Sequence, residues 1–479
     1  MAVLDGLAPE RVFGFFEELC AIPHGSGNTR AISAHLAAFA RDRGLRHIRD
    51  AAGNVLIFQP GTPGREGLEP VILQGHMDMV CEKTADCPLD LTKDGLRLAV
   101  EGDMVYAEGT TLGGDDGIAV AMMLALLDDP TLPHPPLECV FTVDEEIGML
   151  GAAALDVSPL LGRRLLNIDS EAEGVFTASC SGGRVVTAEL PLRRAPWQGQ
   201  AQLLRVEGLT GGHSGVEIDR GRANAVQLLG RLLYAMDRRA PLRLALARGG
   251  GKDNAIPVRA EALLLSADPE AHAAVCEAMG AALREEFAAT DPGLRVTLEA
   301  AENPGLPLDA DSSRRLLTAL LCMPGGVQAM SPYIPGLVQT SLNLGILETG
   351  EDAARAVFCV RSALESGKEM LTDRIAALAE TLGGGVTVSG DYPGWAYRPE
   401  SPLRSLLTEV YREQYGAEPH IAAIHAGLEC GLFAGKLPGL DCVSIGPDLT
   451  EIHTPRERMH IASIQRTWAL LTETLKRMQ

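Results

Sequence analysis

The sequence lacks the paired cysteines that mark zinc fingers and thioredoxin-like redox sites. Its ten cysteines are scattered, and no two of them are separated by two residues, which excludes both classes. Several lie in apolar segments such as 137–143, "LECVFTV". Unpaired thiols in apolar surroundings are typical of a reducing compartment, so we expect free core cysteines.

Long hydrophobic runs are also missing. The longest, such as residues 117–127, "GIAVAMMLALL", fall well short of the roughly 20 residues that span a bilayer. The first 20 residues have no basic stretch followed by an apolar one, which argues against a signal peptide. We therefore expect a cytoplasmic protein that does not enter a membrane.

Positive charge is in deficit. The 42 Lys and Arg residues face 63 Asp and Glu residues, for a formal net charge of −21. This balance argues against nucleic acid or an anionic membrane surface as a partner. Most of the charge is explained by an ordinary solvated acidic surface, although carboxylates can also collect cations.

The first third of the chain alternates apolar strands with helices. Helical patterns cover residues 8–23, 30–44 and 116–129, the last with Asp116 as its predicted cap, and strands are predicted at 54–59, 70–75, 137–143 and 164–169. Strands interleaved with helices indicate an α/β domain with a mostly parallel sheet.

Two domains are predicted from the change in composition near residues 190–200. Two similarly built stretches follow, which predict one large or two small α/β lobes, and a Gly- and Pro-rich segment at 390–402 reads as a return linker. We predict a catalytic domain formed by residues 1–187 and 394–479, interrupted by an inserted domain at 188–393.

Acidic residues and histidines recur where the predicted strands end. They are His76, Asp78, Asp115, Asp116, Asp144, Glu145, Glu146, Asp169 and His453. Each has an ordinary explanation by itself: a helix cap for Asp116, a solvated surface for the glutamates, a structural role for a lone histidine. Their recurrence is not explained in this way, because carboxyl ends of strands in an open α/β sheet share one ligand-binding edge.

These residue types point to metal ions. Histidines and carboxylates without cysteine suit a hard-to-borderline divalent cation. So many acidic groups at one edge would repel one another unless cations lay among them. The set is large enough for two ions that share a carboxylate.

The motifs resemble those of the M20 metallopeptidases, most closely their bacterial aminoacyl-histidine dipeptidases. The matching segments are "HMDMV", "GTTLGGDDGIA", "TVDEEIGMLGA", "NIDSEAEG", "GLTGGHSGVEI", "NAIP", "RSALESGK", "YPGW", "HAGLECGLF" and "SIGPDLTEIHTP", which span nearly the whole chain. The resemblance implies a zinc-peptidase-like catalytic domain with a mixed, mostly parallel sheet and an inserted α/β lid or dimerisation domain.

The resemblance also implies roles for the acidic cluster. Asp115 would bridge two zinc ions. His76 and Asp169 would complete one site, and Glu146 and His453 the other. Asp78 would hydrogen-bond the ring nitrogen of His76 that does not bind metal. Glu145 would be the general base, and a non-proline cis peptide is expected between Asp115 and Asp116.

Further residues are implied in substrate binding. His213, in a glycine-rich turn, would stabilise the oxyanion, within its own subunit or across a dimer. Asn254 and Arg361 would hold the substrate, since a planar guanidinium suits a free carboxylate. His425 and Glu429 would lie near the catalytic edge. A loop histidine in a simple turn and a surface arginine remain the ordinary alternatives.

The resemblance therefore implies a homodimeric dipeptidase with two Zn²⁺ per subunit and small peptides as substrates, and Mn²⁺ or Co²⁺ could serve as the metal. Another M20 hydrolase, either an N-acyl-amino-acid deacylase or a tripeptidase, is the alternative within enzymes. A metal-binding scaffold without turnover is the alternative outside them, although the intact Glu145 argues against it.

Overall fold

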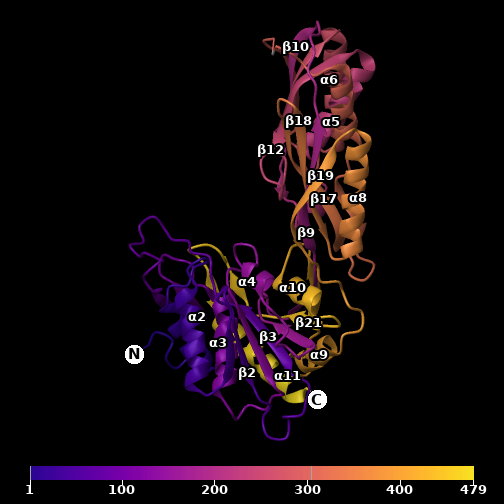
Figure 1. Cartoon of the computed structure of the whole chain (residues 1–479). Coiled ribbons are helices and arrows are strands. Elements are labelled where there is room, and N and C mark those ends of the chain that lie inside the picture. Colours follow the sequence, from indigo (N-terminus) through magenta and orange to yellow (C-terminus); the bar gives the residue numbers. More distant parts are fainter. Residues whose placement is uncertain (1, 304) are drawn as a thin grey trace. The chain divides into compact units, whose positions relative to one another are not determined.

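Two compact units make up the computed structural model, which describes residues 2–303 and 305–479. Unit 1 comprises residues 1–179, 397–423 and 428–479, and unit 2 comprises residues 180–396 and 424–427. Each unit has a separate hydrophobic core. Figure 1 colours the chain by sequence, and it shows that both chain ends contribute to unit 1.

The first unit is built on an eight-stranded mixed sheet with the order β1-β2-β6-β3-β7-β21-β8-β20. Its strands are β1 (Arg46–Arg49), β2 (Val55–Gln59), β3 (Val71–His76), β6 (Leu137–Thr142), β7 (Arg164–Asn167), β8 (Val175–Cys180), β20 (His420–Ile424) and β21 (Asp441–Ser444). The central strands β6, β3, β7 and β21 run parallel, and the pairs β1–β2, β2–β6 and β21–β8 are antiparallel. The predicted α/β fold with a mixed sheet is confirmed.

Helix α3 (Gly114–Asp128) lies in the middle of this unit and is apolar on all sides. Every residue from Gly117 to Leu127 is buried, as expected for a helix enclosed by other elements. It packs against α1 (Glu10–Cys20) and β3. The other helices of the unit are α2 (Arg30–Asp42), α4 (Leu150–Ala154), α9 (Pro402–Tyr415), α10 (Glu429–Lys436) and α11 (Ile461–Arg477). Because α3 is buried, its first residues, which include Asp115, are held in a fixed position.

A small sheet of four strands, with the order β22-β23-β5-β4, also belongs to unit 1. Its strands are β4 (Leu98–Glu101), β5 (Met104–Ala107), β22 (Leu449–Thr450) and β23 (Arg458–His460). Since β22 and β23 pair with each other, the segment between them, which contains His453, is a closed turn at a fixed place.

The second unit is one large lobe, the first of the two predicted alternatives, and it is built on an antiparallel sheet of nine strands. Its path is β15-β10-β14-β12-β17-β18-β9-β19, with β16 on β17. The strands are β9 (Gly182–Pro191), β10 (Gln200–Glu207), β12 (Leu242–Gly250), β14 (Ala260–Ser266), β15 (Arg295–Ala300), β16 (Gly326–Met330), β17 (Val338–Thr349), β18 (Ala353–Ser362) and β19 (Gly385–Tyr392). The predicted boundary at 187/188 falls inside strand β9. This strand is hydrogen-bonded to β18 and β19 on both sides of that position.

Four helices accompany this sheet: α5 (Ala225–Arg239), α6 (Pro269–Glu286), α7 (Ala310–Cys322) and α8 (Glu365–Thr381). Figure 1 shows α5, α6 and α8 along one side of the strands. The two predicted stretches form two halves of the sheet, joined where Gly249 and Gly250 of β12 pair with Leu347 and Ile346 of β17. A two-stranded ribbon, β11 (Gly212–His213) with β13 (Ala255–Ile256), carries His213.

Candidate metal centre and a second polar cluster

The carboxyl ends of the parallel strands bring the predicted ligands together. His76 is the last residue of β3, where it aligns with Thr142 at the end of β6. Glu145 and Glu146 follow β6, and Asp169 follows β7. The site therefore arises where the sheet rule places it, at the edge beyond the parallel strands.

Asp115 lies between two histidines. Its Oδ1 is 3.1 Å from Nε2 of His76, and its Oδ2 is 3.2 Å from Nε2 of His453. Nε2 of His453 is also 3.0 Å from Oε1 of Glu146, and Nε2 of His76 is 3.5 Å from Oδ1 of Asp169. Each oxygen of one carboxylate thus faces a different histidine, and each histidine has a further carboxylate beside it.

The ring of His76 is oriented by the main chain of Asp78. Its Nδ1 donates to the carbonyl oxygen of Asp78 at 3.0 Å. The carboxylate oxygen Oδ1 of Asp78 is farther away, at 3.6 Å, beyond a normal hydrogen bond. A proton on Nδ1 leaves the lone pair of Nε2 free to bind a metal ion.

The carboxylate of Asp78 is turned toward the strand end beside it. Its Oδ1 accepts from the amide of Glu145 at 3.0 Å, and its Oδ2 accepts from the amide of Glu146 at 3.4 Å and from Ser26 Oγ at 2.8 Å. The sequence predicted Asp78 as the partner of His76 alone. The structure adds that its buried carboxylate places the backbone of the two glutamates.

Unusual backbone conformations mark the same loops. Among the described residues, the non-glycine positions with positive φ are Asp144, Met149, Glu451 and His453, at φ values of 54°, 57°, 54° and 60°. All four lie in the segments that follow β6 and β22. Such conformations are costly and cluster where function holds them. The predicted cis peptide between Asp115 and Asp116 is present.

Asp116 stands just before the regular part of α3, where an N-cap lies, but among the described residues no amide of the first helical turn donates to its side chain. Oδ2 of Asp116 accepts from the amide of His76 at 3.2 Å. Residue 116 has non-helical backbone angles, and the regular part of α3 begins after it. Its buried carboxylate therefore links the start of α3 to the end of β3, next to the ligands rather than on the helix axis.

Electrostatic repulsion within the cluster is strong. Burial, and the charges of Asp169, Glu429 and Glu146, raise the pKa of Glu145 to about 9. Burial and the charge of Asp115 raise the pKa of Asp169 to about 6. A bound cation would stabilise the ionised form of these carboxyl groups and so lower the raised pKa values.

The donor set fits metal ions. His76, Asp115 and Glu146 offer one ligand atom each within 4.8 Å of one another, and His76, Asp116 and Asp169 form a second such group. Nitrogen and carboxylate oxygen donors without thiolate suit zinc or a similar divalent ion. The geometry of Asp115, with one oxygen toward each histidine, favours two ions over one.

Glu429 lies beneath this cluster rather than on an open surface. It is fully buried, accepts from Thr142 Oγ1 at 2.7 Å and from Gln74 Nε2, and belongs to unit 1. Burial raises its pKa to about 7. Its Oε1 has no hydrogen-bond partner within residues 2–303 and 305–479. Gln74 carried no signal in the sequence, since a polar residue inside a buried strand is recognisable as functional only when its neighbours are known.

A second polar cluster, formed by His213, Arg361 and His425, lies in unit 2. A Cβ atom built on Gly215 would meet the His425 carbonyl oxygen at 2.5 Å, His213 Cε1 at 2.9 Å and Arg361 Nε at 3.2 Å. Gly215 is therefore the point around which the three residues gather. The structure thus brings His425 to Arg361, although Glu429, four residues later, belongs to the other unit.

Arg361 is a buried cation without an acidic partner. Its side chain is 7% exposed, and no carboxylate of a described residue lies within 4.0 Å of it. One terminal nitrogen donates to Tyr392 Oη at 3.0 Å, and the described residues offer no acceptor to Nε. A buried charge that lacks a counter-ion is costly, so this position favours an anion from outside the protein.

The two histidines beside Arg361 are held in defined tautomers or pairs. Nδ1 of His213 accepts from the amides of Gly215 and Val216, both at 3.2 Å, which leaves the proton on Nε2. His425 pairs with Ser341 Oγ at 2.7 Å, and burial together with the charge of Arg361 lowers its pKa to about 4. Both rings are therefore neutral hydrogen-bonding groups near pH 7.

Asn254 lies next to this cluster. Its carbonyl oxygen accepts from the amide of Ser214 at 2.9 Å, and its side chain is exposed.

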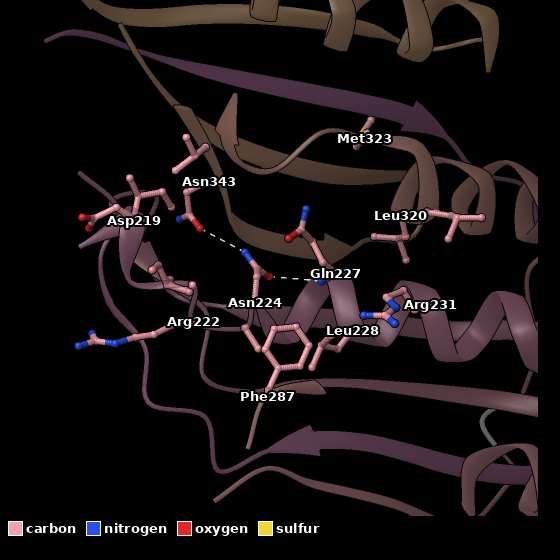
Figure 2. Close-up of a pocket in the computed structure, with 17 residues that line it drawn as sticks. Asp219, Arg222, Asn224, Gln227, Leu228, Arg231, Phe287, Leu320, Met323 and Asn343 are labelled. Atoms are coloured by element: carbon pink, nitrogen blue, oxygen red, sulfur yellow. Dashed lines mark hydrogen bonds between the residues drawn. The ribbon is translucent and has the colours of Figure 1, made fainter. Parts of the chain in front are cut away.

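A cavity of about 470 Å³ elsewhere in unit 2 has a different character. Figure 2 shows that Asn224, at its centre, is already bonded to Asn343 and to the amide of Gln227. Its lining has one acidic side chain, Asp219, and no histidine, so it lacks a catalytic constellation.

Comparison with known proteins decides the family. The model for peptidase family M20/M25/M40 matches residues 72–477. The chain belongs to this family. It is 38% identical over 480 residues to the cytosol non-specific dipeptidase of Escherichia coli K12, covering 99% of both sequences.

Solved structures of M20 peptidases agree with this assignment. The aminoacylhistidine dipeptidase of Vibrio alginolyticus superimposes with a TM-score of 0.94 at 35% identity, covering 99% of this chain and 98% of that one. A tripeptidase of Staphylococcus aureus matches with a TM-score of 0.55 at 18% identity over 98% of both chains, which shows a common fold alone. Among the described residues, no helix is both long and apolar enough to cross a membrane.

Proposed function

We propose that this protein is a dinuclear metallodipeptidase that hydrolyses dipeptides with free termini. The observation that carries the proposal is the position of Asp115, whose two oxygens face His76 and His453 respectively at 3.1 and 3.2 Å. A free carboxyl group, Glu145, accompanies the ligands, and no hydrogen bond to its side chain occurs among the described residues. Ligands and an uncommitted base together suit metal-assisted hydrolysis.

The proposed ligands divide into two sets that share Asp115. His76 and Asp169 complete one set, and Glu146 and His453 complete the other. Bound divalent ions would polarise the scissile carbonyl and lower the pKa of a water molecule. We propose zinc, for which these donors are well suited, and Mn²⁺ and Co²⁺ accept the same ligands.

Glu145 is proposed as the general base. Its neighbour Glu146 is paired with His453 at 3.0 Å, whereas the Glu145 carboxylate has no such partner among the described residues. Its raised pKa would fall toward the working pH once cations lie among the ligands. Glu145 then takes a proton from water and passes it to the leaving amine. Asp78 holds the backbone amides of both glutamates and so keeps the two roles apart.

Substrate recognition is proposed for the second cluster. The guanidinium of Arg361, buried and without an internal acid, would bind the free carboxylate of a peptide. His213 has its ring proton on Nε2 and can donate to a developing oxyanion. Asn254, His425 and Glu429 stay proposed contributors, Asn254 through its exposed amide and His425 by its place beside Arg361.

The relatives favour dipeptides over tripeptides as the proposed substrates. Proteins named as dipeptidases match the chain over nearly its full length at 38% and 35% identity, whereas the tripeptidase is 18% identical. We also propose a cytoplasmic location, in keeping with the name of the Escherichia coli relative, and a homodimer, which the family resemblance implies.

A substrate panel tests the proposal. Purified protein is assayed with dipeptides, tripeptides and N-acetyl amino acids, with and without a chelator, and after metal is restored. The proposal expects cleavage of dipeptides well above the other two classes, loss of activity with chelator and recovery with Zn²⁺ or Mn²⁺. Preference for N-acetyl amino acids would support a deacylase instead, and absence of turnover with every class would support a scaffold.

A further inference from the structure

Glu457 is a buried carboxylate that none of the proposed ligand or substrate roles uses. It is 3% exposed and binds four consecutive backbone amides. Its Oε2 accepts from Leu112 at 2.7 Å and from Gly113 at 3.1 Å. Its Oε1 accepts from Gly114 at 2.8 Å and from Asp115 at 3.4 Å.

The loop of residues 112–115 is shaped to hold this group. Successive N–H groups that converge on one point form a concavity for an anion. Gly113 contributes a left-handed conformation at φ +67°, and a Cβ atom on Gly114 would lie 3.2 Å from Oε1 of Glu457. The two glycines before Asp115 therefore let an internal carboxylate occupy a site that in other proteins takes a phosphate or sulfate.

Glu457 connects two segments that carry proposed ligands. The amide of Asp115 is one of its donors, and His453 lies four residues earlier in the same turn. That turn is closed by its own bonds, from the amide of Glu457 to the Thr454 carbonyl at 3.0 Å and from Thr454 Oγ1 to the Glu451 carbonyl at 2.7 Å. The carboxylate thus fixes the position of the Asp115 backbone relative to the turn that contains His453.

We infer that Glu457 is a positioning residue of the metal centre, which holds Asp115 and His453 at the spacing that two ions require. The inference rests on the ligand roles proposed above for these two residues. It assigns Glu457 no contact with metal or substrate. Outer partners that orient ligands typically contribute 10- to 100-fold in metal affinity or activity.

The test is the metal affinity of Glu457→Gln. The substitution keeps the shape of the side chain. However, its NH₂ group replaces an oxygen that accepts from two of the four backbone amides, and an NH₂ group cannot accept those hydrogen bonds. Metal-free protein is titrated with Zn²⁺ and separately with Mn²⁺ in competition with a chromogenic chelator. We expect both affinities to fall by about 10- to 100-fold, with the weaker site of the pair affected at least as much as the stronger.

Glu138→Gln is the matched control. Glu138 is also buried, at 4% exposure, and its carboxylate also binds only backbone amides, those of Leu161 and Gly162 at 2.9 to 3.0 Å. It lies near the start of β6, at the end of the strand opposite Glu145. This variant should lose thermal stability as Glu457→Gln does and retain the metal affinity of the unmodified protein.

The outcomes separate the possibilities. Unchanged affinity in Glu457→Gln, or an equal loss in Glu138→Gln, overturns the inference. If the Gln variant does not fold, Glu457→Asp replaces it, since a shorter acid keeps the charge but cannot reach all four amides, and unchanged affinity in that variant is equally decisive. Asp115→Ala is titrated alongside: if it keeps both ions, the proposed ligand set fails, whereas a loss there with normal Glu457 variants contradicts the positioning role alone.

Discussion

Two polar clusters in this protein are unbalanced in opposite directions. The cluster of unit 1 gathers Asp115, Glu145, Glu146 and Asp169 around two histidines, and burial together with repulsion from the neighbouring acids raises the pKa of Glu145 to about 9. The cluster of unit 2 gathers two neutral histidines around the buried Arg361, for which the described residues supply no acid within 4.0 Å. One cluster has a deficit of positive charge and the other a deficit of negative charge.

This difference indicates what each cluster binds. Uncompensated charge of one sign inside a protein is unfavourable unless a ligand of the other sign arrives. The first cluster therefore suits metal cations, and the second suits the carboxylate of a peptide. If the two clusters bind ligands of opposite charge, a substitution in one cluster should leave the ligand binding of the other unchanged.

Asp115→Ala should have the largest effect. The shared carboxylate serves both ions, so its removal should lower the metal content from two ions per chain to near zero after dialysis and abolish turnover. His453→Ala should mainly weaken one ion. Metal analysis of the dialysed variants checks this, and equal stoichiometry in the two variants would contradict the bridging role. Arg361→Ala should keep both ions and serves as the control.

Glu145→Ala should retain both ions and lose nearly all activity. A general base contributes typically about 10²- to 10⁴-fold, with a larger loss where the same group protonates the leaving amine. Glu146→Ala, one residue along, should instead lose metal. The pair is compared by kcat and by metal content. Loss of an ion from Glu145→Ala would mean that the two glutamates have exchanged roles.

Arg361→Ala should affect peptides with a free carboxylate and spare those without one. Removal of one partner of a buried charge pair costs about 2–5 kcal/mol, so kcat/KM for a free dipeptide should fall about 30- to several-thousand-fold. The amidated dipeptide should be a poor substrate of the unmodified protein and change little in the variant. If the unmodified protein cleaves acid and amide equally well, Arg361 does not bind the carboxylate.

The pH dependence of stability gives a smaller effect with a defined sign. Burial and neighbouring acids raise the pKa of Glu145 to about 9, and hydrogen bonds that the His453 ring donates to Asp115 and Glu146 raise the pKa of His453 to about 10. A raised folded-state pKa contributes stability below the unfolded value that is lost as pH rises through the folded value. Metal-free protein should therefore melt at a progressively lower temperature between pH 6 and pH 9.

Metal-loaded protein should show a weaker trend, because bound cations stabilise the ionised carboxylates. Thermal melts at several pH values, with chelator and with added Zn²⁺, measure both curves. Glu145→Gln is the control: it removes one of the titrating groups, so its metal-free curve should be flatter. A melting temperature that rises with pH in the metal-free protein would contradict the assigned directions.

Much of the catalytic fold could be predicted from the sequence, because its signals are local. Apolar strands that end in Asp, Glu or His are visible without a structure, and a mostly parallel sheet follows from the alternation of strands with helices, although the order of its strands does not. The insertion was harder. Its strands and helices also alternate, yet it forms one antiparallel sheet, because pairing between distant strands such as β9 and β18 decides topology and leaves no local trace.

The sequence alone determined which residues are candidates for metal-binding and acid–base chemistry, since the candidates are recognised by residue type and by position at a strand end. The tertiary structure alone decided how those residues are held. Asp78 was predicted near His76, but the turn of its carboxylate toward the amides of Glu145 and Glu146 depends on how the loop after β6 closes. Glu457 reaches the amides of residues 112–115 across more than 340 positions of chain. Gly113 and Gly114 are visible in the sequence, but a hydrogen bond to a backbone amide does not depend on the side chain of its partner. Nothing in the sequence therefore shows that Glu457 is the group these amides bind.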